Sequence, residues 1–165
     1  FTGVWYTMIR SDEAKVNATE SDPVQKKEDE STYYEPGEAF VEKNMDDNEL
    51  FRVEVDLVTK IPEEADLPNL KSSMEYVAFE LFARNSDDYG VEFKPYYSKL
   101  KVDGSQINPA DFVIIEQDGW NKYLLESGGS FRLVLIYPVE RNAKEMDLTI
   151  RPEFYYKDII YKVRR

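Results

Sequence analysis

The side chains that could do chemistry in this sequence are carboxylates, lysines, tyrosines and hydroxyls, because its 165 residues contain neither His nor Cys. This composition removes disulfides, thiolate nucleophiles, imidazole bases and the usual zinc and copper ligands. Two carboxylates flanking a sugar would still permit glycoside hydrolysis. With 33 acidic residues some pair will always lie close together, and no nucleophile motif accompanies them. We therefore expect a non-enzymatic protein with no catalytic residues and no cofactor.

Three acidic clusters could offer oxygen ligands to a cation. They are Asp46-Asp47-Asn48-Glu49, Glu63-Glu64-Asp66 and Asp87-Asp88. Calcium takes six to eight oxygen ligands, but none of the clusters has the spaced acidic loop with its Gly and distant Glu. Solvation of loops explains them better, so we predict no metal ligand, and calcium binding stays open.

Aromatic residues are the strongest candidates for a recognition surface. Several occur as adjacent pairs, and in a strand one member of each pair must face away from the core. Rings on a surface could stack on sugars or form a protein contact, whereas the alternative is ordinary sheet packing. The interaction surface that we predict comprises Trp5, Tyr34, Tyr96, Trp120 and Tyr156.

The charge distribution narrows the class of partner. Residues 11–66 hold 18 acidic against 6 basic residues, which accounts for the whole net charge of −12. Such a chain repels nucleic acid, because phosphate binding needs clustered Lys and Arg. No run of 18 apolar residues occurs, so no segment is predicted to span a membrane.

The elements that must position these side chains read as β-strands. Leu50–Val58, Tyr76–Ala83, Ser130–Tyr137 and Met146–Ile150 alternate apolar and polar residues, as half-buried strands do. Their common phase predicts a core. Its members are Phe51, Val53, Val55, Phe79, Leu81, Phe131, Leu133, Leu135, Leu148 and Ile150.

Turn signals complete the pattern. Asp103-Gly104 predicts a hairpin, Gly128-Gly129 a turn, Asp118-Gly119 a break, and Pro138 the end of a strand. No segment of ten residues has convincing helix caps. The sequence thus predicts an all-β, antiparallel β-sandwich of seven to nine strands, with long acidic N-terminal loops.

The N-terminal part differs from this body. Gly3–Arg10 reads as an apolar strand, whereas Ser11–Thr32 lacks apolar periodicity and is rich in charge. We predict one domain over residues 1–165, with a mobile acidic loop over residues 11–32.

Residues Tyr76–Arg151 resemble an immunoglobulin-like domain family of unknown function, found in lipoproteins and exported proteins of Gram-positive bacteria. The similarity lies in the order of three features: the Asn-closed strand Tyr76–Asn85, the aromatic segment Phe93–Gly104, and the Gly-rich turn leading through Phe131 to Pro138. The acidic N-terminal part and the insertion around Val113–Leu125 depart from the family pattern. The family supplies no catalytic residues.

The resemblance implies an extracytoplasmic protein on the outer face of the bacterial cell membrane. Because the sequence begins with Phe1, we expect a removed signal peptide and a lipid-bearing Cys just upstream. The expected function is an interaction module of a cell-surface lipoprotein that binds an unidentified cell-envelope protein. A carbohydrate-binding module for cell-wall glycan is the main alternative, and a small hydrolase is the third.

Overall fold

The computed structural model describes residues 32–153 and 158–165. The predicted strand Gly3–Arg10, the predicted mobile loop up to residue 31, and the side chains of Trp5 and Tyr156 lie outside the described residues. The domain prediction for residues 1–165 likewise extends beyond them.

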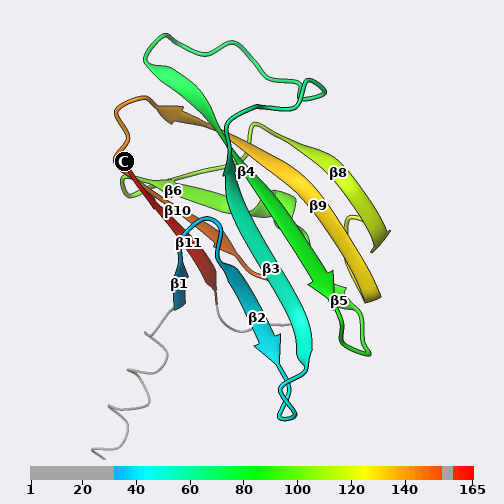
Figure 1. The fold of residues 1–165 in the computed structure, drawn as a ribbon. Helices are drawn as coiled ribbons and strands as arrows, with labels where there is room; N and C mark the ends of the chain where they lie inside the picture. Colours follow the sequence, from blue (N-terminus) through cyan, green and yellow to red (C-terminus); the bar gives the residue numbers. More distant parts are fainter. Residues whose placement is uncertain (1–31, 154–157) are drawn as a thin grey trace, which may run out of the picture. The chain divides into compact units, whose positions relative to one another are not determined.

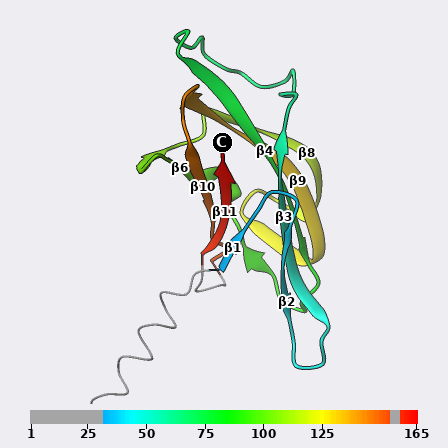
Figure 2. The same cartoon turned by 60° about the vertical axis from the view of Figure 1, so that its left-hand side comes forward.

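Two β-sheets packed face to face make up the described part of the chain (Figure 1). The five-stranded sheet has the order β1-β11-β10-β6-β7; the six-stranded sheet has the order β2-β3-β4-β9-β5, and β8 also pairs with β9. Figure 2 shows the two sheets as separate layers. The strands are β1 (Thr32–Tyr34), β2 (Ala39–Lys43), β3 (Glu49–Val58), β4 (Met74–Asn85), β5 (Val91–Glu92), β6 (Lys99–Val102), β7 (Ser105–Ile107), β8 (Asp111–Trp120), β9 (Leu124–Glu140), β10 (Glu145–Ile150) and β11 (Ile159–Arg164). The predicted all-β sandwich is confirmed.

The strand count and one pairing differ from expectation. Residues 32–153 and 158–165 contain eleven strands rather than seven to nine. The surplus comes from strands such as β5 and β7, which are too short to show an alternating pattern. The pair β1–β11 is parallel, whereas the other pairs are antiparallel. Within the same residues, no helix is long and apolar enough to cross a membrane.

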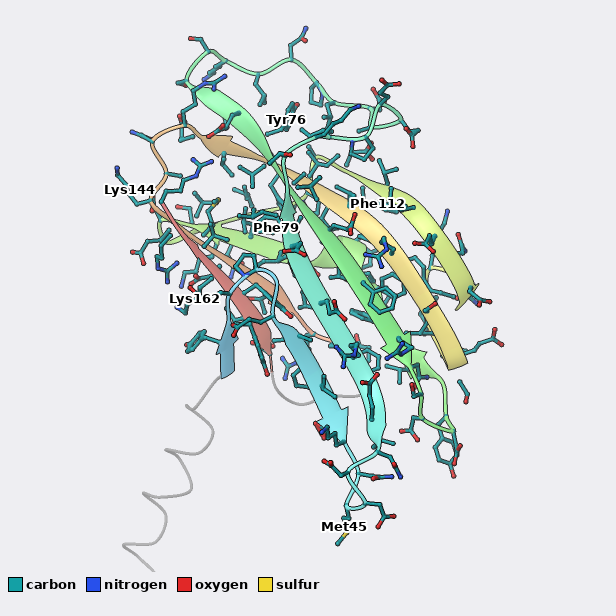
Figure 3. All side chains as sticks on the ribbon, viewed as in Figure 1. Met45, Tyr76, Phe79, Phe112, Lys144 and Lys162 are labelled. Carbon is teal, nitrogen blue, oxygen red and sulfur yellow. The ribbon has the colours of Figure 1, made fainter. Side chains whose placement is uncertain are left out.

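The predicted core is confirmed in full. All ten residues are at most 1% exposed and belong to the cluster between the sheets. Phe79 of β4 is labelled in Figure 3, and Leu148 of β10 meets the same cluster from the other sheet. On β3, Arg52 and Glu54 lie on the opposite face and form an ion pair at 3.1 Å. Alternation along each strand therefore assigns its faces correctly.

Strand β9 is longer than the sequence indicates. Gly128-Gly129 and Pro138, predicted as a turn and a stop, both lie inside its 17 residues. A Cβ on Gly129 would lie 2.8 Å from the carbonyl oxygen of Gly119, so this glycine permits a close approach of β8. Pairing with β8 reaches only to Ile136. Pro138 therefore sits where β9 has one neighbour, which is where a strand tolerates proline.

A second apolar cluster covers the outer face of the six-stranded sheet. Ala78, Val113, Val134 and Ile136 are buried there, beneath Ile61, Leu67 and neighbouring apolar residues of the β3–β4 connection. The Tyr76 hydroxyl donates a hydrogen bond to the carbonyl of Pro68, which fastens the connection to β4. Figure 3 labels Tyr76 at this end of the sheet. Val134 and Ile136, on the face of β9 opposite the main core, are thus also buried among apolar residues.

The hairpin predicted at Asp103-Gly104 joins β6 to β7. Both residues have positive φ, 44° and 94°, as a two-residue hairpin turn requires. The Asp103 carboxylate accepts a hydrogen bond from the backbone N–H of Glu145 at 2.9 Å. This bond holds the hairpin beside the start of β10, the strand that pairs with β6.

Because two tyrosines are buried in the sandwich, we predict that the fold loses stability at alkaline pH. The hydroxyls of Tyr137 and Tyr161 donate to the carbonyls of Ser98 and Glu38, each at 2.7 Å, and burial raises the pKa of both far above the ordinary 10.0. The unfolded chain releases these protons near pH 10, whereas the folded chain retains them. We expect the free energy of unfolding to fall above pH 10 by about 1.4 kcal/mol per tyrosine and pH unit. Denaturant titrations at pH 9, 10 and 11 measure the free energy of unfolding. If the Tyr137→Phe variant lost stability as steeply with pH as the unaltered chain, Tyr137 would not be a source of the pH dependence.

Candidate functional site

The described members of the predicted aromatic surface do not form one surface. Tyr34 is half-buried in β1, where its ring lies 5.4 Å from that of Tyr161, and burial raises its pKa. Tyr96 is half-buried too, stacks on Phe112 at 5.1 Å and donates from its hydroxyl to the carbonyl of Lys122 at 2.6 Å. Their rings therefore serve packing at least as much as recognition.

The prediction that Trp120 is exposed is wrong. Only 3% of the residue is accessible, its Nε1–H donates to the carbonyl of Phe93 at 3.0 Å, and its ring stacks on Phe131 at 4.0 Å. The cause is an irregularity in β8: the register shifts between Asp118 and Trp120, with φ of 72° at Gly119. The extra residue returns Trp120 to the core side, opposite Leu125. Asp118-Gly119 is therefore a bulge within the strand and does not end it.

Other tyrosines are the exposed ones. Tyr33, Tyr89, Tyr97 and Tyr123 are among the exposed large hydrophobic residues, and Tyr97 reaches 70%. In the pairs Tyr33-Tyr34 and Tyr96-Tyr97 one ring is exposed, but it is Tyr33 and Tyr97, not the predicted Tyr34 and Tyr96. Adjacency shows that one ring of a pair is exposed, whereas only the position of the core shows which one.

A groove of about 410 Å³ lies on the outer face of the five-stranded sheet. Three neighbouring strands form its floor, because Lys99 lies opposite Thr149 and Lys101 lies opposite Gln106. Ser98, a residue of the groove lining, accepts a hydrogen bond at its backbone carbonyl from the buried Tyr137 hydroxyl. We name this groove the basic groove. Its lining residues are Lys94, Tyr97, Ser98, Lys99, Lys101, Gln106, Thr149, Arg151, Glu153 and Asp158.

Charge distinguishes the basic groove from the rest of this acidic chain. Four cationic side chains line it against two carboxylates. Arg151 pairs with Asp158 at 3.5 Å, and the Lys94 ammonium lies 5.0 Å from the centre of the Tyr123 ring. Lys99 and Lys101 take part in none of the ion pairs found in the described part of the chain. Two exposed ammonium groups are thus available to an anionic ligand.

A larger hollow of about 600 Å³, between β1 and β11, offers less to a ligand. Its cations are already engaged: Lys162 lies 4.1 Å from the centre of the Tyr33 ring, and Arg164 pairs with Glu145 at 3.0 Å. Figure 3 labels Lys162 on β11. The basic groove is therefore the better candidate for recognition.

The acidic clusters noted in the sequence lie apart from this groove. Asp46 and Asp47 belong to the β2–β3 turn, where Lys43 pairs with Asp47 at 3.1 Å. Asp87 lies in the turn after β4, where its backbone N–H donates a hydrogen bond to the side-chain Oδ1 of Asn85 at 3.0 Å. Over residues 32–153 and 158–165, no group of three or more acidic side chains is arranged to hold a metal ion.

Comparison with known proteins gives similarity of structure only. No family model matches the chain, and no curated protein matches it. A solved structure of a putative lipoprotein (ycdA) from Bacillus subtilis has a TM-score of 0.48 and 12% identity, over 70% of this chain and 36% of that one. The chain thus spans about a third of the length of that protein. An uncharacterized β-sandwich protein from Clostridium difficile has a TM-score of 0.47 and 11% identity, over 82% of this chain and 95% of that one. At such values neither match carries a function over to this chain.

Proposed function

We propose that this β-sandwich is a non-enzymatic interaction module of a bacterial cell-surface lipoprotein, and that it binds a cell-envelope protein through the basic groove. The observation that carries the proposal is the pair Lys99 and Lys101, exposed and without ion-pair partners in the described residues, in a chain of net charge −12. Local positive charge attracts the acidic groups of a partner, whereas the acidic remainder of the chain repels anionic surfaces elsewhere.

The shape of the basic groove supports binding more than catalysis. It lies on the face of a sheet, and its lining holds two carboxylates, Glu153 and Asp158. Asp158 is ion-paired with Arg151. Tyr97 adds an exposed ring at the rim, and Tyr and Arg are enriched at protein interfaces.

Two features of the sequence support the proposed location outside the cytoplasmic membrane. A chain without Cys needs no oxidising compartment and tolerates one, and the family resemblance points to lipid-anchored proteins. The acidic residues within 11–66 would repel an anionic lipid surface and hold the module away from it. The membrane contact is then left to the anchor.

A cell-wall glycan is the second candidate ligand. The Tyr97 ring and the polar side chains of Ser98, Gln106 and Thr149 could contact a sugar. The buried ring of Trp120 is not available for stacking, which removes one basis of this alternative. The rings of Tyr34 and Tyr96 are partly engaged in packing.

Charge reversal in the groove tests the proposal. The full chain with Lys99→Glu and Lys101→Glu is expected to capture its envelope protein roughly tenfold less than the unaltered chain at physiological ionic strength, because two attractive contacts become repulsive. Quantitative pull-down from solubilised envelope, before and after protease treatment of the envelope, measures the loss and separates protein from glycan.

A matched control makes the result specific. Lys60→Glu with Lys71→Glu changes the net charge equally at two exposed positions of the β3–β4 connection, outside the basic groove. The proposal is supported if the control variant still captures the envelope protein and the groove variant does not. Equal capture by all three chains would refute it.

A further inference from the structure

The cations of the basic groove follow a regular step. Lys99 and Lys101 are two residues apart on one face of β6, which places their Cα atoms about 6.6–6.8 Å apart. Thr149 of β10 lies opposite Lys99, and Arg151 follows it by two residues. Lys101 and Lys99 thus occupy successive two-residue steps along β6, and Arg151 lies one such step further along the neighbouring strand, just past the last residue of β10.

An extended polypeptide has the same repeat. Side chains at alternate positions of a strand lie on one face, with the same spacing of about 6.6–6.8 Å. Acidic residues at every second position would therefore meet the cations in register. We infer that the ligand of the basic groove is an extended segment of a partner protein with acidic side chains at alternate positions. This inference rests on the proposed function and names the chemistry of its partner.

The contributions of the three cations differ. Arg151 already pairs with Asp158 at 3.5 Å, so a ligand carboxylate there must compete with that carboxylate. Lys99 faces Thr149 across the ladder, and Lys101 faces Gln106 on one side. On its other side Lys101 lies opposite Asp147, which Arg164 engages at 3.2 Å. Lys99 and Lys101 therefore carry most of the attraction, and Thr149 and Gln106 can hydrogen-bond the segment between its acidic side chains.

The rings around the groove favour a peptide over a sugar. The Lys94 ammonium lies over one face of the Tyr123 ring, 5.0 Å from its centre, and the Tyr123 hydroxyl donates to the Glu92 carboxylate. Tyr97 is then the one ring of the groove lining that is open to stacking. A groove with regularly spaced cations and a single exposed ring suits an acidic polypeptide better than a glycan, which would need several rings to stack on its sugars.

Synthetic peptides test the spacing directly. Fluorescence anisotropy of the full chain compares three decapeptides: alternating Glu and Ser, the same residues with all Glu contiguous, and alternating Gln and Ser. We expect the alternating acidic peptide to bind at least fivefold more tightly than its block isomer, with affinity that falls as salt rises. No saturable binding is expected for the Gln peptide.

Variants connect the preference to the groove. Lys99→Gln with Lys101→Gln is expected to lower the affinity for the alternating peptide roughly five- to tenfold and to abolish the preference, whereas Lys60→Gln with Lys71→Gln changes neither. Equal affinity for the two acidic isomers, or unchanged affinity in the groove variant, overturns the inference. Tighter, Lys99- and Lys101-dependent binding of polygalacturonate or polyphosphate also overturns it, in favour of an anionic polymer.

The two proposals fail in different ways. If capture from the envelope depends on Lys99 and Lys101 but the alternating peptide shows no preference, the acidic-segment inference fails and the interaction module stands. If neither experiment depends on these lysines, the groove is not the recognition site and both fail.

Discussion

Replacing Trp120 by alanine is expected to lower the free energy of unfolding by about 3–5 kcal/mol. The indole is 3% exposed, stacks on Phe131 at 4.0 Å and donates its Nε1–H to the Phe93 carbonyl at 3.0 Å. The substitution removes this buried contact area, opens a cavity and leaves a buried carbonyl without its donor. Because domains are stable by only about 5–15 kcal/mol, the variant should unfold at much lower denaturant concentration.

Urea titration followed by far-ultraviolet circular dichroism measures this change without relying on tryptophan fluorescence. Tyr97→Ala is the matched control, since its 70% exposed ring should change stability by no more than about 0.5 kcal/mol. A loss below about 1 kcal/mol in the Trp120 variant would show that the indole is not part of the core. It would also restore Trp120 as a candidate for ligand stacking.

Changing Asn85 to aspartate is expected to destabilise the sandwich by about 3 kcal/mol or more at pH 7. Asn85 is fully buried at the end of β4, and its Nδ2 donates to the carbonyls of Tyr89 at 2.8 Å and Leu125 at 3.1 Å. A carboxylate of the same shape has no N–H to donate and places negative charge against these carbonyl oxygens. The asparagine thus ties the turn after β4 to the start of β9, a role that an acidic side chain cannot take.

The effect of Asn85→Asp should depend on pH in a defined direction. The carbonyls raise the pKa of the new carboxyl in the folded state, so the protonated form is favoured there. The penalty is then small below the unfolded pKa of about 3.9 and grows as the pH rises towards the folded pKa. Asn48→Asp, in the exposed turn between β2 and β3, is the control and should be nearly neutral. Equal unfolding midpoints for the two variants at pH 7 would contradict the role of Asn85.

The candidate site was much less predictable than the fold. Among the described residues, the predicted aromatic surface comprises Tyr34, Tyr96 and Trp120, but Trp120 is buried and the more exposed ring of each tyrosine pair is its neighbour. Lys99 and Lys101 are not part of the predicted surface. These lysines alternate along the chain, but in a sequence with 21 basic residues such spacing does not by itself indicate a binding site. The pairing of β6 with β10 is what brings Thr149 beside Lys99.

Alternation along a strand is a local property, and the sequence by itself determined what depends on it: an all-β sandwich, ten core residues, the charged outer face of β3 and the hairpin at Asp103-Gly104. Only the tertiary structure decided what depends on register between strands. Gly129 lies within the continuous strand β9, where its lack of a Cβ permits the close approach of β8, and one extra residue at Gly119 turns Trp120 inward. Pairing of β10 with β6 brings Lys99 beside Thr149, fifty positions later in the chain, because hydrogen bonds between strands join residues that no local pattern connects.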